Sequence, residues 1–397
     1  MTSRSADRPP RVLVTTPDPN RQGGVIAYWQ SVASSLTAVA IPFMVGRRQE
    51  RPTRFQRGAT VVWDWFGFAT TLVGSRIDVV QLNPSLDPRS LVRDGALLLI
   101  AKAMKKPVVV LIHGWMESTE REIANRYRWA FRAVYGRADA IFVLHSRFRG
   151  VLRGWGCVQP IHTTTSVIDP ACLAAVGRVR DKDVVHARMV PTVLFMARIM
   201  EQKGIHQAIE AIGLAVPRIP DVRLLVAGDG PELTAAREHV QRADLGGHVE
   251  FLGDVRGEKK VGALLASSIY LLPTKHPEGM PTTVLEAMAL SLIPIVPLTA
   301  GLADFLEDGV LGVVEGSTDP RRLCAQIDRV WRDAELRARI GLTAQEYALC
   351  HFTPLAVARR LDRVYAELLA REDWPNSVID DRDWFVMHDD SPNLLPS

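Results

Sequence analysis

Residues 276–290 read HPEGMPTTVLEAMAL, a loop punctuated by Gly and Pro that leads into a helical pattern. We expect Pro281 to be the first helical residue, because the N–H that proline lacks would have no partner there. The amides of Thr282 and Thr283 would then face an anion at the positive end of the helix dipole. Glu286 follows Thr282 by four residues and shares its helix face. This stretch predicts a nucleotide site, with amides for the diphosphate and a carboxylate for the ribose hydroxyls.

Strands and helices alternate on both sides of this stretch, which predicts an α/β fold. In the second half we expect strands at residues 192–197, 222–227, 249–253, 269–273 and 293–296, and helices from Pro320 onward. In the first half we expect them at residues 11–15, 41–45, 77–83, 107–112 and 140–144. The pattern predicts two doubly wound domains in series. We place them at residues 1–182 and 183–350, followed by a helix at 351–371 and an acidic, aromatic tail at 372–397 that we expect to pack on the first domain.

Two cations follow the first strand of the second domain, at Arg198 and Lys203. The carboxyl ends of parallel strands share an edge, so we expect both side chains to face the helix that begins near Thr282. An Arg and a Lys at a strand end are usually plain surface residues, and a lone Glu278 or Glu286 is usually solvated. Together they favour a diphosphate site in which the cations neutralise the leaving group without a metal ion.

The first domain offers two weaker candidates. Gly23 and Gly24 lie in the loop after the first strand, where they would let a backbone approach a ligand at a helix N-terminus. A plain turn is the commoner explanation for such a pair. His113 follows a buried strand, so it also lies at a carboxyl edge, although a histidine bonded to a neighbouring loop is an equal alternative.

Composition narrows the class of protein. With 397 residues, 47% hydrophobic and 23% charged, the chain is typical of a soluble globular protein of two or three domains. No apolar run approaches the ~20 residues of a membrane span. The four cysteines share no metal-ligand spacing, so we expect reduced thiols and a cytoplasmic location.

The charge is unevenly distributed along the chain. Residues 1–180 hold 25 Lys/Arg against 12 Asp/Glu, and the remainder is acidic. The basic excess includes Arg47, Arg48, Arg51, Arg54, Arg57, Lys102, Lys105 and Lys106. It fits equally well with peripheral contact of the first domain with an anionic membrane and with a solvated surface that faces the acidic half. Nucleic acid is not expected as a partner, because no binding motif accompanies the charge.

In order along the chain, these motifs resemble a retaining glycosyltransferase of the GT-B fold, glycosyltransferase family 4 (group 1). The resemblance spans about residues 10–370, and it rests on Gly23-Gly24, His113-Gly114, Arg198 with Lys203-Gly204, Gly228-Asp229-Gly230-Pro231, and Glu278-Gly279 with Leu285-Glu286-Ala287-Met288-Ala289. It implies two Rossmann-like domains that face each other across a cleft, with the last helix crossing back to the first domain.

The resemblance also implies an activity. A hexose-type sugar would pass from a UDP- or GDP-sugar to an acceptor hydroxyl with retained configuration, without cofactor or metal. The acceptor would be a lipid-linked or polysaccharide intermediate of bacterial cell-surface glycan synthesis, at the inner face of the plasma membrane. Two alternatives remain: a sugar-nucleotide epimerase or hydrolase of this fold, and a non-catalytic partner subunit.

By the same resemblance, individual residues receive roles. Arg198 and Lys203 would bind and neutralise the diphosphate, and Glu286 would bind the ribose. Glu278 and His113 would contact the donor sugar near the anomeric carbon. The remaining donor-binding residues would be Gly23, Gly24, Gly228, Gly279, Met280, Pro281, Thr282 and Thr283. The chain departs from the family at residues 162–169, which read HTTTSVID where relatives have a Pro-Asn-Gly-Val-Asp-like turn.

Overall fold

The computed structural model describes residues 8–18, 23–46, 54–276, 279–299 and 301–370. The chain folds into two compact units, one formed by Met1–Thr165 with Pro354–Ser397 and the other by Ser166–Thr353. The expected division between residues 182 and 183 lies seventeen residues beyond this boundary. Residues 166–182 belong to the second unit because α7 (Pro170–Ala174) packs against α11 (Gly257–Leu265) and α12 (Thr282–Ala289) of that unit. The acidic tail at 372–397 lies outside the described residues.

Unit 1 is a six-stranded parallel sheet in the order β2-β1-β3-β4-β5-β6. Its strands are β1 (Arg11–Thr16), β2 (Val39–Met44), β3 (Val79–Leu82), β4 (Val108–Ile112), β5 (Ala140–Val143) and β6 (Ile161–Thr163). The five residues of β4 are all buried, as a parallel strand covered on both faces requires. The short strand β6 was not predicted, because three residues at the start of an unusual interdomain segment carry no periodicity.

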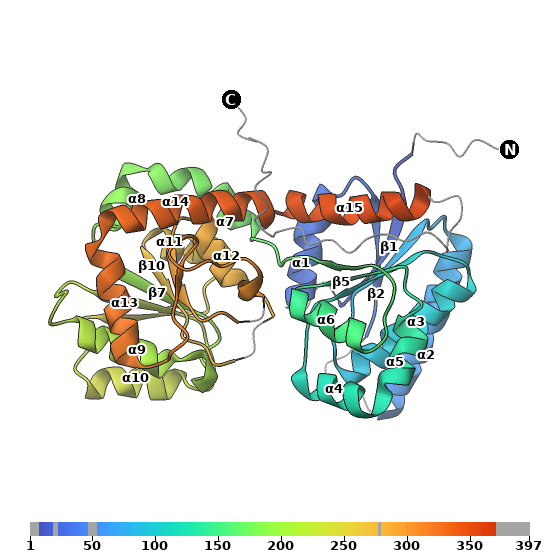
Figure 1. Ribbon diagram of the computed structural model, residues 1–397, viewed down its shortest axis with the longest axis horizontal. Helices are drawn as coiled ribbons and strands as arrows, with labels where there is room; N and C mark the ends of the chain where they lie inside the picture. The colour runs from blue at the N-terminus through green and yellow to red at the C-terminus, as the bar shows by residue number, and fades with distance from the viewer. Residues whose placement is uncertain (1–7, 19–22, 47–53, 277–278, 300, 371–397) are drawn as a thin grey trace. The chain divides into compact units, whose positions relative to one another are not determined.

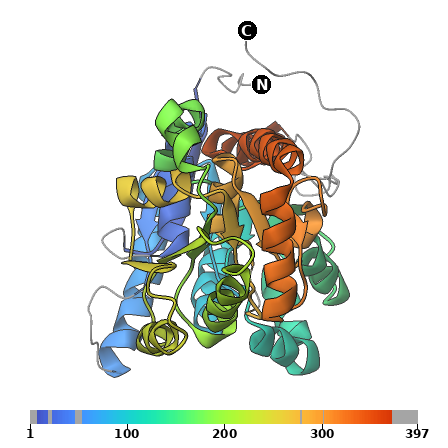
Figure 2. The ribbon, with the colours of Figure 1, turned by 90° about the vertical axis from the view of Figure 1, so that its left-hand side faces the viewer.

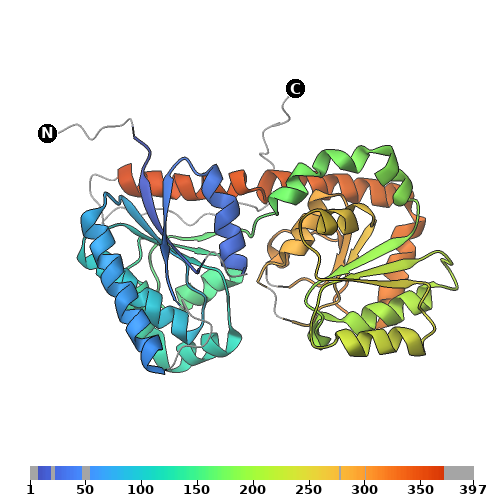
Figure 3. The ribbon, with the colours of Figure 1, turned by 180° about the vertical axis from the view of Figure 1, so that it is seen from behind.

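Helices cover both faces of this sheet (Figures 1 and 3). They are α1 (Gly24–Val32), α2 (Arg54–Gly74), α3 (Pro88–Ala103), α4 (Glu117–Glu122), α5 (Arg128–Tyr135), α6 (Ser146–Gly154) and α15 (Pro354–Ala370). Between α4 and α5 the helical stretch is interrupted by a π-helical turn, η2 (Ile123–Tyr127). Helices α2, α3 and α5 pack side by side, whereas α15 packs on α1.

The last helix is held in unit 1 by polar contacts. Asp362 accepts hydrogen bonds from the backbone N–H groups of Thr37 and Ala38. Tyr365 donates its hydroxyl proton to Oε1 of Gln81 over 3.0 Å, and both side chains are fully buried. The final helix of the sequence is therefore part of the first unit.

The basic segment of unit 1 is only partly described. Arg47, Arg48 and Arg51 lie outside the described residues. Lys102 forms an ion pair with Asp139 at 2.9 Å, and Lys106 donates to the carbonyl of Ile77. These two lysines are engaged within the unit, so the exposed basic surface of the described chain comes from other residues.

Unit 2 is a second six-stranded parallel sheet, in the order β12-β11-β10-β7-β8-β9. Its strands are β7 (Thr192–Met196), β8 (Arg223–Ala227), β9 (Val249–Gly253), β10 (Ile269–Leu271), β11 (Ile293–Val296) and β12 (Val313–Val314). The remaining helices are α8 (Lys182–Ala187), α9 (Ile205–Ala215), α10 (Leu233–Arg242), α11 (Gly257–Leu265), α12 (Thr282–Ala289), α13 (Pro320–Arg332) and α14 (Ala334–His351).

The helices of unit 2 form two layers. Figure 1 shows α9, α10 and α13 on one side of the sheet and α7, α11, α12 and α14 on the other. Helix α13 packs along α9, as the view of this unit in Figure 2 shows in orange and green. The prediction of two doubly wound α/β domains is confirmed. Within the part of the chain that is described, no helix is long and apolar enough to cross a membrane.

Candidate functional site

The carboxyl edge of the unit 2 sheet contains a topological switch point. From β7 the chain moves outward to β8 and β9, and then it returns to β10 on the other side of β7. The loops that leave β7 and β10 diverge there, and open α/β sheets bind ligands at such a crevice. Arg198 and Lys203 follow β7, and the stretch from residue 276 onward follows β10.

Close backbone contacts join these two loops. The N–H of Lys275 donates to the carbonyl of Gln202 over 2.8 Å. Gly204 has φ +80°, and a Cβ there would collide with the carbonyl oxygen of Pro273, so only glycine fits. Arg198 is exposed and Lys203 is half-buried. The cation-bearing loop is therefore held against the loop that leads into α12.

A third loop, after β8, closes on the first. The N–H of Ile199 donates to the carbonyl of Asp229 over 2.9 Å. Gly228 has φ +142°, and a side chain there would strike the carbonyl oxygen of Ala197. Gly228, predicted to touch the donor, thus has a packing role that supports the backbone next to Arg198.

Helix α12 begins at Thr282, and Pro281 is its N-cap residue rather than its first helical residue. The prediction for Pro281 is wrong by one position, because its ψ of 109° is extended. Tyr270 donates to the carbonyl of Met196 over 3.0 Å, so the Thr283 hydroxyl is the donor in its 2.6 Å bond to Tyr270. This bond ties the first turn of α12 to the end of β7.

The segment before α12 is also packed in place. A Cβ at Gly301 would collide with the carbonyl oxygen of Gly279, so the loop after β11 lies directly against it. Met280 is buried, and its carbonyl oxygen and sulfur both accept hydrogen bonds from Ser166. Glu278 lies outside the described residues.

Glu286 is not the exposed carboxylate that its sequence context suggests. It is 4% exposed, and its Oε1 accepts from Nζ of Lys260 over 2.9 Å. Lys260 also donates to Oδ2 of Asp169 over 2.6 Å. The Oε2 atom of Glu286 is buried and makes no regular hydrogen bond among the described residues, although the backbone of Asp169 lies close enough to the carboxylate to lower its pKa. A buried carboxylate oxygen without a donor is costly, which makes it a candidate acceptor for ligand hydroxyl groups.

The electrostatics of this trio follow from burial and charge. Burial raises the pKa of Glu286, and the Lys260 ammonium opposes that rise. Burial lowers the pKa of Lys260, but the two carboxylates outweigh it, so the net pKa lies above the ordinary value. Lys260 therefore remains an ammonium ion that fixes one oxygen of Glu286 and leaves the other available.

Sequence reasoning missed Lys260 and Asp169. Asp169 precedes Pro170, an Asp-Pro pair that is typical of a helix start, and it does cap α7. That signal predicts a cap but not a partner for Lys260. Lys260 is one of two adjacent lysines on a helix, and nothing local distinguishes the buried Lys260 from the exposed Lys259.

In unit 1, His113 lies at the carboxyl end of β4. Its Nε2 is 3.2 Å from Oδ1 of Asn83, whose amide nitrogen donates to the carbonyl of Thr15. Oδ1 is therefore the acceptor, and Nε2 carries the proton. Tyr28 packs edge-on against the imidazole at 4.9 Å. Burial lowers the pKa of His113 to about 3, so the ring is neutral near pH 7.

Gly23 and Gly24 lie where the chain enters α1. Gly23 is the N-cap residue and Gly24 the first residue of the helix. A Cβ on Gly24 would meet no other atom within 4 Å, so this position is open. The β1 loop that holds both glycines and the β3 loop that follows Asn83 flank the switch point of the unit 1 sheet.

These residues form two groups. Arg198, Lys203, Gly228, Gly279 to Thr283 and Glu286 gather at the carboxyl edge of unit 2, whereas Gly23, Gly24 and His113 lie at that of unit 1. Among the described residues, no cluster of three or more His, Cys, Asp or Glu side chains forms a metal site. The unit 2 group offers cations, helix amides and a buried acceptor, which suits a ligand with phosphate and hydroxyl groups.

Comparison with known proteins finds a family model that matches most of the second unit. Residues 180–347 match the model of the family described as glycosyl transferases group 1. The exopolysaccharide phosphotransferase SCO2592 of Streptomyces coelicolor is 28% identical over 194 residues, which are 48% of this chain and 20% of that protein. The phosphatidyl-myo-inositol mannosyltransferase of Mycolicibacterium smegmatis is 31% identical over 176 residues, which are 44% of each chain. The chain thus spans less than half the length of both curated relatives.

The fold as a whole also has solved counterparts. The crystal structure of Anabaena Alr3699/HepE in complex with UDP and glucose aligns with a TM-score of 0.66. The alignment covers 90% of this chain and 100% of that one, at 16% sequence identity. At this identity the likeness establishes the shared fold.

Proposed function

We propose that the protein is a retaining, metal-independent glycosyltransferase, because residues 180–347 match the model of the family described as glycosyl transferases group 1. It moves a hexose-type sugar from a nucleotide-diphosphate sugar to an acceptor hydroxyl. UDP-sugar is the first candidate donor, because the structurally similar HepE was crystallised with UDP and glucose; a GDP-sugar is the second.

The observation that carries this proposal is the state of Glu286. Among the residues that the structure describes, its buried Oε2 makes no regular hydrogen bond, while Lys260 holds its Oε1. Two ribose hydroxyl groups would supply the missing donors, and each such bond to a charged acceptor is worth ~1.5–3 kcal/mol. The ribose would then lie beside the first turn of α12, which positions the diphosphate at the amides of Thr282 and Thr283.

The diphosphate would be held by Arg198 and Lys203 together with these amides. The bond between the anomeric carbon and the diphosphate oxygen breaks, and its electron pair stays on the phosphate. Arg198 and Lys203 stabilise that charge as it develops, in place of a metal ion. Gly228 supports the Arg198 backbone, and Gly279, Met280 and Pro281 line the approach to the phosphate.

Two further residues, Glu278 and His113, would orient the sugar itself. Glu278 would hold sugar hydroxyl groups and support positive charge at the anomeric carbon. The His113 ring is neutral near pH 7 and its Nε2 donates to Asn83. Its Nδ1 would therefore accept a hydrogen bond from a sugar hydroxyl group. Gly23 and Gly24 would close on the distal phosphate. The acceptor oxygen attacks the face that the diphosphate leaves, and its proton passes to the departing phosphate, so the configuration is retained.

The acceptor we propose is a lipid-linked or polysaccharide intermediate of cell-surface glycan synthesis, reached from the cytoplasmic side of the membrane. The names of two relatives, an exopolysaccharide phosphotransferase and a phosphatidyl-myo-inositol mannosyltransferase, support this class. The excess of Lys and Arg in residues 1–180 fits a phosphate-bearing acceptor.

A thermal-shift screen with UDP, GDP and ADP tests the donor. A nucleotide at 100 times its dissociation constant should stabilise the protein by about 2.7 kcal/mol. No response to any nucleotide would overturn the proposal. With the donor sugar known, NMR of the product reports the anomeric configuration. Free sugar or an epimer released without acceptor would instead indicate a hydrolase or an epimerase.

A further inference from the structure

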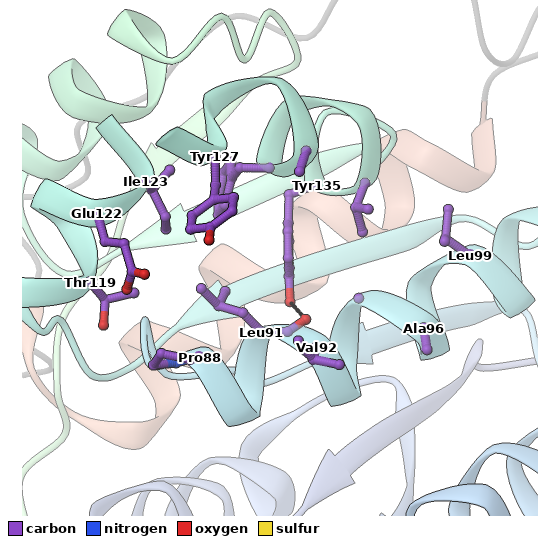
Figure 4. A pocket seen from close by; sticks show the side chains of 14 residues that line it. Pro88, Leu91, Val92, Ala96, Leu99, Thr119, Glu122, Ile123, Tyr127 and Tyr135 are labelled. Carbon is purple, nitrogen blue, oxygen red and sulfur yellow. Dashed lines mark hydrogen bonds between the residues drawn. The ribbon is translucent and has the colours of Figure 1, made fainter. Parts of the chain in front are cut away.

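Unit 1 contains an apolar cavity of about 590 Å³ that the proposed transfer reaction does not use. It lies between α3 on one side and α4, η2 and α5 on the other (Figure 4). Its lining residues are Pro88, Leu91, Val92, Gly95, Ala96, Leu99, Thr119, Glu122, Ile123, Tyr127, Ala130, Phe131, Val134 and Tyr135. This volume falls in the ~300–1,000 Å³ range of ligand pockets.

The chemistry of the lining selects an apolar occupant. The hydroxyl of Tyr135 already donates to the carbonyl of Leu91 over 2.8 Å, as the dashed line in Figure 4 shows. Thr119 and Glu122 lie together at one end, and the rest of the wall is aliphatic or aromatic. A sugar or nucleotide would lose its hydration here without gaining hydrogen-bond partners, whereas a hydrocarbon chain would not.

A local backbone irregularity accompanies the cavity. Helix α4 continues directly into the π-helical turn η2. Both ends of that turn, Ile123 and Tyr127, line the cavity. Further along, α3 and α5 approach closely, since a Cβ at Gly95 would lie 3.1 Å from Cγ1 of Val134. Isolated π turns occur frequently at functional sites, where they displace side chains from regular helical positions.

The cavity is elongated along α3. Its lining on that helix runs from Pro88 to Leu99, which corresponds to roughly 16 Å at 1.5 Å per residue. Half of the ~30 Å hydrocarbon core of a bilayer is about the same length. One acyl chain of a membrane lipid therefore matches the cavity in polarity and in length.

The surroundings of the mouth favour an anionic lipid surface. Residues 123–137 contain Arg126, Arg128, Arg132 and Arg137 and no carboxylate, and all four arginines are exposed. Of the three acidic residues before them, Glu117 pairs with Arg121 and Glu120 with Arg147, whereas Glu122 is an exposed carboxylate at one end of the cavity that the four arginines outnumber. Excess positive charge next to an apolar slot attracts anionic lipid and repels a cationic one.

Large apolar side chains are exposed beside these arginines. Trp129 is 74% exposed, Val92 69% and Tyr127 46%. Trp and Tyr favour the interface between headgroups and hydrocarbon. These exposed apolar side chains lie on α3 and on the η2–α5 helix. They form a wider contact surface than the single carboxylate headgroup of a free fatty acid would cover.

We propose that the cavity between α3 and the η2–α5 helix receives one hydrocarbon chain of an anionic membrane lipid. The arginines at positions 126, 128 and 132 attract the lipid surface, and the chain enters between Val92 and Tyr127. The site holds the protein at the membrane and is separate from the residues assigned to donor binding, so it does not depend on the identity of the donor or acceptor.

Photo-crosslinking tests the site in the full chain without any nucleotide. Vesicles of phosphatidylglycerol that carry a diazirine in the acyl chain are irradiated with the protein, and labelled peptides are identified by mass spectrometry. We expect labels on Leu91, Val92, Ile123 or Tyr127. Labels confined to other parts of the chain, or equal labelling by phosphatidylcholine vesicles, would overturn the proposal.

Cavity-filling variants supply the matched control. Ala96→Leu adds a side chain inside the cavity, and labelling of the lining residues should fall about tenfold. Ala133→Leu adds the same side chain on the exposed face of α5 and should change nothing. If Ala96→Leu lowers the urea midpoint, Ala130→Leu fills the other wall and serves as a second variant. Undiminished labelling in both filled variants contradicts a chain in the cavity.

The charge requirement has its own pair of variants. Arg126→Gln with Arg132→Gln should reduce cosedimentation with phosphatidylglycerol vesicles at least fivefold, and added salt should reproduce the loss. Arg321→Gln with Arg329→Gln removes two exposed arginines from α13 and should have no effect. A concentration-dependent dimer that disappears in Ala96→Leu, without lipid labelling, would instead show that a second copy covers the cavity.

Discussion

The role assigned to Lys203 depends on its position in the fold. In the sequence it is an ordinary lysine near a strand end, but the loop that holds it is bonded to the segment before α12. Lys203→Ala should lower kcat by ~10²–10³-fold and weaken UDP binding, because a cation that faces the leaving group is lost. Lys259→Ala removes an exposed lysine elsewhere and should leave both unchanged. Unaltered turnover in Lys203→Ala would refute the assigned role.

Lys260 positions Glu286 through a buried ion pair. Lys260→Met leaves that carboxylate buried without a counterion, so the free energy of unfolding in urea should fall by about 3 kcal/mol. Adding Glu286→Gln should restore much of this loss, since a neutral amide replaces the stranded charge. An additive loss in the double variant would contradict direct pairing.

The same variants test ribose binding. UDP affinity should fall in Lys260→Met and in Glu286→Gln, whereas the affinity for 2′,3′-dideoxy-UDP, which lacks the hydroxyl groups, should change little. Calorimetric titration with both ligands measures the difference. Equal losses for both ligands would place Glu286 away from the ribose.

His113 makes stability depend on pH. Its folded-state pKa is about 3, below the unfolded value of ~6.5, so the unfolded chain binds the proton first as pH falls. The stabilisation that neutral His113 provides is present above pH ~6.5 and declines between there and pH 3. The slope stays under ~1.4 kcal/mol per pH unit, because a single imidazole binds at most one proton.

His113→Gln isolates this term, because its amide can still donate to Asn83 and does not titrate. The difference in unfolding free energy between wild type and His113→Gln should shrink or change sign between pH 7.5 and 5. A difference that is constant over this range would show that His113 is not desolvated.

At the scale of the element, α15 is held by specific buried polar contacts. Tyr365→Phe removes the donor to Gln81 and leaves that amide oxygen buried and unpaired. The free energy of unfolding should fall by ~1–3 kcal/mol. Leu355→Ala changes an exposed residue of the same helix and should cost under ~0.5 kcal/mol. Equal effects would mean that α15 is held by general packing.

The elements themselves were largely predictable. Strands such as β4 and β7 consist almost entirely of apolar residues. This pattern is typical of a parallel strand, because both of its faces are buried. The π turn in the helix after β4 was not predictable, because residues 117–135 keep a helical pattern throughout and no local signal marks the interruption. Strand β6 carries too few residues for a period.

At the scale of the whole molecule, strand order places the site. Nucleotide binding should protect the backbone amides of residues 198–204 and 279–286 from hydrogen exchange, because both loops leave the switch point of one sheet. Amides of β5 in unit 1 provide the internal control and should exchange unchanged. Protection limited to unit 1 would contradict donor binding in unit 2.

The sequence by itself determined the two α/β domains and the set of charged and glycine residues at their strand ends, because burial periods and glycine requirements are local. Only the tertiary structure decided which charges meet. A glutamate at the start of a helix, such as Glu286, is usually solvated, yet Glu286 is buried beside Lys260 and Asp169. Lys260 precedes it by 26 residues and Asp169 by 117 residues. Such a pairing depends on how α7, α11 and α12 pack, and no local pattern of residues encodes that packing.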